Sequence, residues 1–417
     1  MGNSLNIAVI GMGRRAVSLV AQLHPIAPDF KLAAVADPDV DGARERSREA
    51  GLGDDSVRFF SDEGRLLEHA DAYDGILIAS SCHLHTPLAL KVAETGLPLF
   101  LEKPVSVSNE QVAALRGAYA GREKSVVVSF PLRFTPLFEA AMKIVRSGDL
   151  GTINQVQAIN NVPYGWVYYG RPVHREYGVS QGLWLQKATH DFDYLNQILG
   201  RPRAVTAMMS RSVYGGDMPH ELLCSSCDLA ETCPESPEGK ERRGNHGGIQ
   251  IADHPCVFGA EIANQDAGSA IVQYEGGVHA AYTQNFVSRR AAATRGAIVT
   301  GYRGTLSFDW HTHRLKLIDH HSDREEEQEV TVTTGHMGGD EALLRNFVDV
   351  CMGRDESRSD LTAGLTSVAM CLAARESAHR QAWMPIPDIG APGLLAAAPP
   401  IEPTPSNLEP LPLAAAD

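Results

Sequence analysis

The sequence predicts two domains of different class, an α/β domain followed by an α+β domain. Up to about residue 130, short apolar strands alternate with helical segments, which is typical of a doubly wound parallel sheet. The first strand ends in the glycine turn Gly11-Met12-Gly13, as in dinucleotide-binding Rossmann folds. After about residue 150 the hydrophobic pattern changes to period two, which favours an open, mostly antiparallel sheet with helices on one face.

The first domain is expected over residues 1–130. Its strands are expected at 5–10, 31–36, 76–79, 97–101 and 126–130, with helices at 14–23, after 36, from about 87 and from about 109. The apolar strand at 97–101 runs directly into Glu102-Lys103-Pro104. Ligands of such sheets bind outside the carboxyl ends of the strands, so Lys103 is placed where a proton donor or acceptor is useful.

The second domain is expected over residues 131–384. Strands are predicted at 153–162, 203–213, 268–275, 278–287, 296–308, 314–319 and 329–333, and helices at 189–199, 338–352 and 361–380. Gly276-Gly277 indicates a hairpin between two of these strands. Residues 214–257, rich in Gly, Pro, Cys and charge, read as a long insertion, and the Pro/Ala-rich residues 385–417 read as an extended tail.

The bulk properties exclude several kinds of partner. The formal net charge of −14 argues against nucleic acid and against an anionic membrane surface. No apolar run approaches the length that spans a bilayer, and the first residues carry no apolar signal segment, so we expect a cytoplasmic protein.

The glycine turn predicts a nucleotide site. In Gly11-x-Gly13-x-x-Ala16, the first glycine makes the turn and the second admits a pyrophosphate, with Met12 between them. Asp37, at the end of the second strand, can hold ribose hydroxyls and repel a 2′-phosphate, unless it only caps the next helix. We therefore favour NAD over NADP, although Arg14 and Arg15 could hold a phosphate.

Several motifs in the same order carry a family resemblance. With the glycine turn, Asp37, the segment 80–85 (Ser-Ser-Cys-His-Leu-His) and Glu102-Lys103-Pro104, the chain resembles the glucose–fructose oxidoreductase / inositol dehydrogenase (Gfo/Idh/MocA) family over nearly its whole length. The resemblance implies a Rossmann domain and an open, mostly antiparallel sheet domain that covers the nicotinamide. It also implies oxidation of a sugar, inositol or related polyol with NAD or NADP, and a homo-oligomer, either a dimer or a tetramer.

The resemblance assigns roles to particular residues. Lys103 matches the active-site lysine and Glu102 its partner, while Ser80, Ser81 and His85 match the turn that lines the nicotinamide side. Arg133 matches an arginine close to the cofactor. The second-domain signature, an Asp four residues before a His, here has Gln186 before His190, with Lys187 three residues before it, as in some branches of the family.

These residues suggest a mechanism for the oxidation of a secondary hydroxyl. His190 titrates near neutrality and is the expected proton acceptor, Lys103 hydrogen-bonds the same hydroxyl, and Lys187 orients the substrate. Two alternatives stay open. Some relatives use a tightly held NAD to oxidise transiently and cleave a glycosidic bond, and others are non-catalytic regulators that bind the dinucleotide.

An aromatic and polar cluster precedes the predicted helix at 189–199. It suits a carbohydrate ring, although packing explains most of its members equally well. We expect His174 and Arg175 nearest the substrate, with Trp184 beside them. The cluster consists of Tyr164, Trp166, Tyr168, Tyr169, His174, Arg175 and Trp184.

Four cysteines gather in the insertion, at Cys224, Cys227, Cys233 and Cys256. Such a set suits a structural zinc ion, with an iron–sulfur cluster or four free thiols as the alternatives. His220, His246 and His254 are substitutes for one of the thiols.

Overall fold

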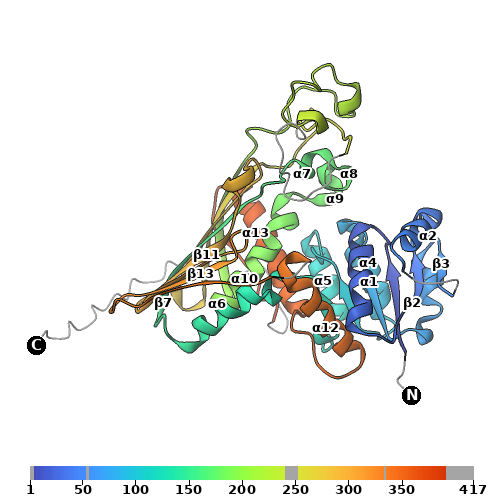
Figure 1. Ribbon diagram of the computed structural model, residues 1–417, viewed down its shortest axis with the longest axis horizontal. Helices are drawn as coiled ribbons and strands as arrows, with labels where there is room; N and C mark the ends of the chain where they lie inside the picture. The colour runs from blue at the N-terminus through green and yellow to red at the C-terminus, as the bar shows by residue number, and fades with distance from the viewer. Residues whose placement is uncertain (1–3, 53–55, 240–251, 333–334, 391–417) are drawn as a thin grey trace, which may run out of the picture.

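The computed structural model describes residues 4–52, 56–239, 252–332 and 335–390. Its first part is a six-stranded parallel sheet with the order β3-β2-β1-β4-β5-β6 (Figure 1). The elements are β1 (Leu5–Ile10), α1 (Arg14–Ile26), β2 (Phe30–Ala36), α2 (Val40–Glu49), β3 (Arg58–Phe60), α3 (Glu63–Leu67), β4 (Gly75–Ile78), α4 (His85–Ala93), β5 (Leu99–Leu101), α5 (Asn109–Ala118) and β6 (Val126–Val128). Buried helix residues pack on both faces of this sheet, so the predicted doubly wound fold is confirmed.

The second part is a nine-stranded sheet with the order β14-β13-β12-β11-β7-β10-β9-β8-β15. All its neighbouring strands are antiparallel except β7 and β10, which confirms the expected mostly antiparallel sheet. Its strands are β7 (Ile153–Asn161), β8 (Pro202–Ser210), β9 (Ala267–Tyr274), β10 (His279–Asn285), β11 (Thr294–Gly301), β12 (Gly304–Asp309), β13 (Arg314–Asp319), β14 (Glu325–Glu329) and β15 (Met384–Pro385). The helical segments are α6 (Pro136–Ser147), α7 (Val167–Gly170), α8 (Pro172–Arg175), α9 (Tyr177–Ser180), the π-helical turn η5 (Trp184–Ala188), α10 (Thr189–Leu199), α12 (Gly339–Cys351) and α13 (Leu361–Arg380).

Two strand predictions were wrong. The run 296–308 is two strands, because the chain reverses at Tyr302-Arg303 between Gly301 and Gly304. The last strand lies at Glu325–Glu329 instead of 329–333. All its side chains are exposed, so its sequence has no alternation of apolar and polar residues that would predict a strand. It pairs with β13 in antiparallel register, and ion pairs such as Lys316–Glu325 join the two strands.

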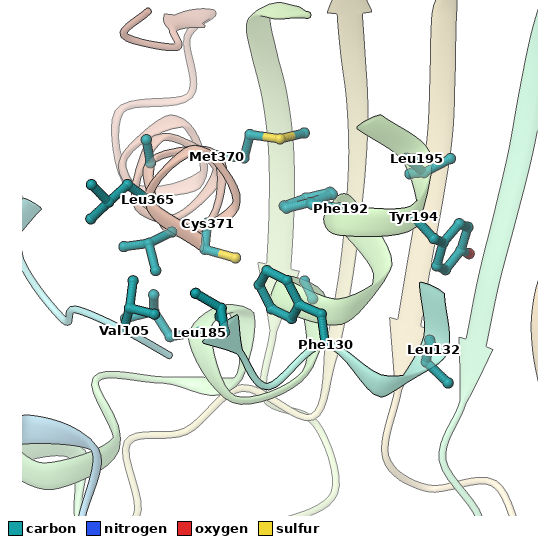
Figure 2. Packing of buried hydrophobic residues seen from close by; sticks show 14 of the residues in the cluster. Val105, Phe130, Leu132, Leu185, Phe192, Tyr194, Leu195, Leu365, Met370 and Cys371 are labelled. Carbon is teal, nitrogen blue, oxygen red and sulfur yellow. The ribbon is translucent and has the colours of Figure 1, made fainter. Parts of the chain in front are cut away.

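One hydrophobic core joins the two domains. Helices α10 and α13 lie between the nine-stranded sheet and α5 of the first domain (Figure 1). Figure 2 shows Val105 and Phe130 of the first domain near Leu185 and Phe192 of the second, with Cys371 of α13 beside them. The two domains are therefore joined by helices packed in one buried core.

Helix α12 returns to the first domain although it follows the second sheet in sequence. Leu343, Leu344 and Phe347 are buried with α1 on one face of the parallel sheet, and the Phe347 ring contacts Phe100 at 5.5 Å between centroids. The start of α12 thus lies beside the start of α1, close to the glycine turn.

Candidate active site

The glycine turn has the shape that a dinucleotide requires. Gly11 has a φ of +86°, and a Cβ there would lie 2.9 Å from backbone atoms of Ser80. A Cβ on Gly13 would meet no atom within 4 Å, so the space in front of the α1 N-terminus is open. Ala16 is buried against the sheet. The turn at Gly11 is tightly packed, the space beside Gly13 is open, and the N–H groups at the start of α1 face that space. This arrangement fits a bound pyrophosphate.

Asp37 is tied to this turn. Its Oδ2 accepts a hydrogen bond from the Met12 N–H at 2.8 Å, and its Oδ1 accepts one from the Asp39 N–H at 2.9 Å. The cap of α2 is Asp39, which accepts from the Gly42 N–H. The sequence left open whether Asp37 only caps that helix, and the structure assigns the cap to its neighbour. The Asp37 carboxylate, 14% exposed, also lies 3.9 Å from Arg46 Nη2, and it is not used as the cap of α2.

Arg15 is engaged within the protein. It donates from Nε to Glu102 Oε1 at 2.6 Å, and its two Nη atoms bind the Asp340 carboxylate at 2.7 and 2.8 Å. Nη2 also donates to Ser129 at 3.2 Å. Arg14 is exposed. Asp340 could not be predicted as a partner of Arg15, because only the return of α12 to the first domain brings it here. Since Arg15 is bound on three sides, it is poorly placed to hold a 2′-phosphate.

Glu102 and Lys103 extend this network toward the second domain. The Glu102 carboxylate also accepts from Ser129 Oγ at 2.7 Å and from the Lys103 N–H at 3.1 Å. Burial would raise the pKa of Glu102, but the charges of Arg15 and Lys103 outweigh it and lower the pKa. Lys103 precedes a cis peptide and donates from Nζ to the Gln186 carbonyl oxygen at 2.9 Å. The pKa of Lys103 is lowered, mainly by burial and further by the charge of Lys187. Cys82 and Glu102 act in the opposite direction and only partly offset this effect.

The segment 80–85 forms a turn at the carboxyl end of β4. His85 is buried, with Nδ1 2.8 Å from the Pro104 carbonyl oxygen and Nε2 3.0 Å from that of Ser80, so it fastens the turn to the strand end after β5. Ser80 and Ser81 are partly exposed. Cys82 Sγ accepts from Gln186 Nε2 at 3.2 Å, which gives a second link between the domains.

The second-domain residues lie on a π-helical turn that continues into α10. Gln181 and Gly182, both with positive φ, redirect the chain just before the turn. Such turns are frequent at functional sites. Lys187, 5% exposed, donates from Nζ to Tyr164 Oη at 2.7 Å, and burial lowers its pKa.

His190 follows one turn after Lys187 and is 7% exposed, with its ring edge against Phe130. Burial lowers the pKa of His190 well below its ordinary value, and the charges of Lys103 and Arg295 add to the effect. Its Nδ1 has no hydrogen-bond partner among the described residues. A lowered pKa favours the neutral imidazole, which is the form that can accept a proton, so the expected role of His190 stays a prediction.

Two rings of the aromatic cluster lie beside Lys187, whose Nζ is 4.8 Å from the centre of the Tyr164 ring and 5.8 Å from that of Tyr168. Tyr164 is partly exposed, and His174 contacts the Tyr168 ring at 5.3 Å. Burial and the charge of Lys103 lower the pKa of His174 to about 4. Tyr164 was expected only as a ring that could pack on a sugar, and its hydrogen bond to Lys187 has no signal in the sequence.

Three predicted site residues point elsewhere. Arg133 is bound by both carboxylate oxygens of Asp193, so its guanidinium joins α10 to the first domain. Arg175 is 2% exposed and donates to the carbonyl oxygens of His220 and Cys256, which turns it into the insertion. Trp184 is 1% exposed and stacks on Phe192 in the core.

The cysteines of the insertion lie close together. Cys224, Cys227, Cys233 and Cys256 line one cavity of about 20 Å³ with His254. Within the described ranges, no group of three or more His, Cys, Asp or Glu side chains is arranged to hold a metal ion. The prediction of structural zinc therefore finds no support. His246 lies outside the described residues. The Nδ1 atom of His220 lies 3.0 Å from Nη2 of Arg175.

No helix in the part of the chain that the structure describes is both long and apolar enough to cross a membrane.

The chain matches known proteins over both domains. Residues 5–130 match the oxidoreductase family with an NAD-binding Rossmann fold, and residues 138–307 match the GFO/IDH/MocA C-terminal domain. The oxidoreductase YteT of Bacillus subtilis (strain 168) is 26% identical over 344 residues, covering 74% of this chain and 79% of that protein. The inositol 2-dehydrogenase of Streptomyces avermitilis is 25% identical over 297 residues, covering 70% and 82%.

Solved structures agree on the fold. A levoglucosan dehydrogenase in complex with NADH and levoglucosan superposes with a TM-score of 0.72 at 18% identity, covering 92% of this chain and all of that one. The two family matches, on the domain that carries the glycine turn and on the domain that carries Lys187 and His190, lead to one conclusion. The chain is an NAD-binding oxidoreductase of the Gfo/Idh/MocA family.

Proposed function

We propose that the protein oxidises a secondary hydroxyl of a sugar, inositol or related polyol, with NAD as the oxidant. One observation carries the proposal. Lys103, at the carboxyl end of β5, donates to the Gln186 carbonyl oxygen at 2.9 Å, on the turn of the other domain that carries Lys187 and leads into His190. The same strand end is linked through Glu102 to Arg15, which follows the dinucleotide turn. The names of the relatives, inositol 2-dehydrogenase among them, support a polyol substrate.

The residues divide the work in the following way. The N–H groups at the start of α1 and the open face of Gly13 hold the pyrophosphate, and Asp37 accepts from the ribose hydroxyls. Bound NAD supplies the hydride acceptor, which no side chain can provide. Lys103 uses one N–H on the Gln186 carbonyl oxygen and has two left for the substrate oxygen. His190, as a neutral ring, orients the same hydroxyl by a hydrogen bond.

Asp37 and Arg15 together favour NAD over NADP. The carboxylate of Asp37 repels a 2′-phosphate, and Arg15 is already bound by Glu102 and Asp340.

The test is reduction of added NAD, followed by absorbance, with a panel of inositols, free sugars and glycosides. The proposal expects NADH from at least one free polyol. Release of sugar from a glycoside without NADH would instead indicate cleavage through transient oxidation. Dinucleotide binding without either reaction would indicate a regulator.

We further propose that the protein is a homo-oligomer that pairs through the open face of the nine-stranded sheet. This face carries a depression of about 690 Å³ and exposes Ile271, Ile298 and Ile318. Exposed apolar patches of this kind mark interaction surfaces. Light scattering of Ile298→Lys should then show a smaller particle than the wild type, and an unchanged mass would count against this face.

A further inference from the structure

We infer that Tyr164 is the proton acceptor of the reaction, with Lys187 holding its phenolic oxygen. This inference rests on the proposed oxidation of a hydroxyl and deepens it, because it names the base. It starts from geometry. Lys187 Nζ lies 2.7 Å from Tyr164 Oη and 4.8 Å from the centre of the Tyr164 ring. The ammonium thus contacts both the oxygen and the ring that would carry the negative charge.

The position of Tyr164 is fixed by its neighbours in sequence. It stands three residues after the end of β7, a central strand, and is followed by Gly165. A Cβ on Gly165 would lie 1.8 Å from the Phe286 carbonyl oxygen, so the backbone there packs directly on another strand end. The side chain of Tyr164 remains partly exposed while Lys187 behind it is buried. A buried cation that contacts the phenolic oxygen is the arrangement that stabilises a phenolate as proton acceptor.

The surrounding charges favour the phenolate. Arg295 on β11 and Lys103 after β5 add positive charge near Tyr164. The carboxylate of Asp191 on α10 is occupied by Arg295, Asn160 and Tyr282. Burial alone would raise the pKa of Tyr164, yet Lys187, Arg295 and Lys103 outweigh it and lower the pKa. For the neighbouring Tyr168 burial is decisive and raises the pKa.

The other basic groups of the site are worse acceptors. His190 is kept neutral by burial and by the cations around it, so it binds a proton weakly. Lys103 donates to a carbonyl oxygen and is better suited to donate to the substrate as well. In the step, the substrate O–H bond breaks and its proton passes to Tyr164 Oη. The hydrogen on the carbon leaves with its electron pair to the oxidised nicotinamide, and the carbon–oxygen bond becomes a carbonyl.

The first test uses the protein without cofactor or substrate. A pH titration of tyrosinate absorbance should show one tyrosine that ionises below the others. Tyr164→Phe should remove this early transition, and the matched variant Tyr168→Phe should keep it. Lys187→Met should move it upward by about one pH unit or more, since an opposite charge at this distance lowers a pKa by about 1–3 units. An early transition that survives in Tyr164→Phe would overturn the assignment.

The second test is the pH profile of kcat/KM on a substrate found by the NADH assay. Tyr164→Phe should lower kcat/KM by on the order of 10²–10⁴-fold, and the remaining rate should rise with pH without a plateau. A folded Tyr164→Phe enzyme with the wild-type profile and activity within about threefold would refute the role of acceptor. A wild-type enzyme that reduces NAD with no polyol would refute the proposed function instead, while the titration would still decide whether Tyr164 and Lys187 form the ionising pair.

Discussion

Replacing Gly11 by alanine should destabilise the protein even without cofactor, whereas the same change at Gly13 should leave stability unchanged and weaken NAD binding. Both glycines belong to one turn, but their surroundings differ. Gly11 has a φ of +86° and faces the Ser80 backbone, while Gly13 is extended, with φ −78° and ψ −179°, and faces open space. The pair therefore separates the glycine that the fold needs from the glycine that the ligand needs.

The magnitudes follow from these surroundings. A left-handed backbone costs an alanine roughly 1–2 kcal/mol, and a methyl 2.9 Å from the Ser80 backbone adds about 1–3 kcal/mol of overpacking. The free energy of unfolding of Gly11→Ala should thus fall by about 2–5 kcal/mol. For Gly13→Ala the change should stay within about 0.5 kcal/mol, as for other open positions. Its methyl would occupy the approach to the pyrophosphate and should raise the NAD dissociation constant at least about tenfold, or about 1.4 kcal/mol.

Chemical denaturation of the cofactor-free proteins and a fluorescence titration with NADH measure the two quantities separately. The reasoning fails if Gly13→Ala binds NADH like the wild type, because the phosphates would then lie elsewhere. It also fails if Gly11→Ala is as stable as the wild type, because the contact with Ser80 would then yield at no cost.

Three further predictions concern charges in and beside the site. Asp37→Asn keeps an acceptor for the Met12 N–H but loses the charge, so the ratio of NADP to NAD dissociation constants should fall about tenfold or more in competition titrations; an unchanged ratio would remove Asp37 from cofactor choice. Lys103→Met should lower kcat by about 10²-fold or more and change the NADH dissociation constant less than about threefold, and near-normal turnover would contradict the mechanism. Burial raises the pKa of Asp340, but hydrogen bonds and charges from Arg15 and His336 outweigh it and lower the pKa. The unfolded chain then takes up this proton first, so the stabilisation is present above about pH 4 and lost as the pH falls below it. Asp340→Asn should flatten that acid limb in denaturation experiments, and an unaltered slope would show that the carboxylate is not responsible.

Five strands of the six-stranded parallel sheet could be predicted, because each is a short apolar run that ends in a turn. The edge strand β3 was missed, because it has only three residues and none of them is fully buried. The burial of β1 and β4 on both faces leaves a continuous hydrophobic signal. The charged strand β14 left none, since pairing with β13 and not burial holds it in place. The packing of α12 on the first domain could not be predicted either, because its apolar face fits any buried surface and only the tertiary fold selects which one.

Among the site residues, too, those placed by the local sequence could be predicted and those placed by the tertiary fold could not. Gly11 and Asp37 could be predicted, because the local strand–turn–helix context determines their direction. Arg133 and Arg175 could not, because a long side chain turns to the nearest carboxylate or carbonyl group, and sequence does not say which is nearest. Tyr164 was one of seven aromatic and polar residues in the predicted cluster, and its hydrogen bond from Lys187 distinguishes it.

The candidate active site is positively charged although the whole chain is negatively charged. The protein carries a net charge of −14, yet Lys103, Lys187 and Arg295 stand near one another. The closest carboxylates, Glu102 and Asp191, are occupied by hydrogen bonds from other groups, so they offset this field only in part. Fixed positive charge in a buried site stabilises an oxygen that becomes negative, and salt screens it little. The field that favours loss of a proton from a substrate hydroxyl also keeps His190 neutral, which leaves a phenolic oxygen as the group best able to receive that proton.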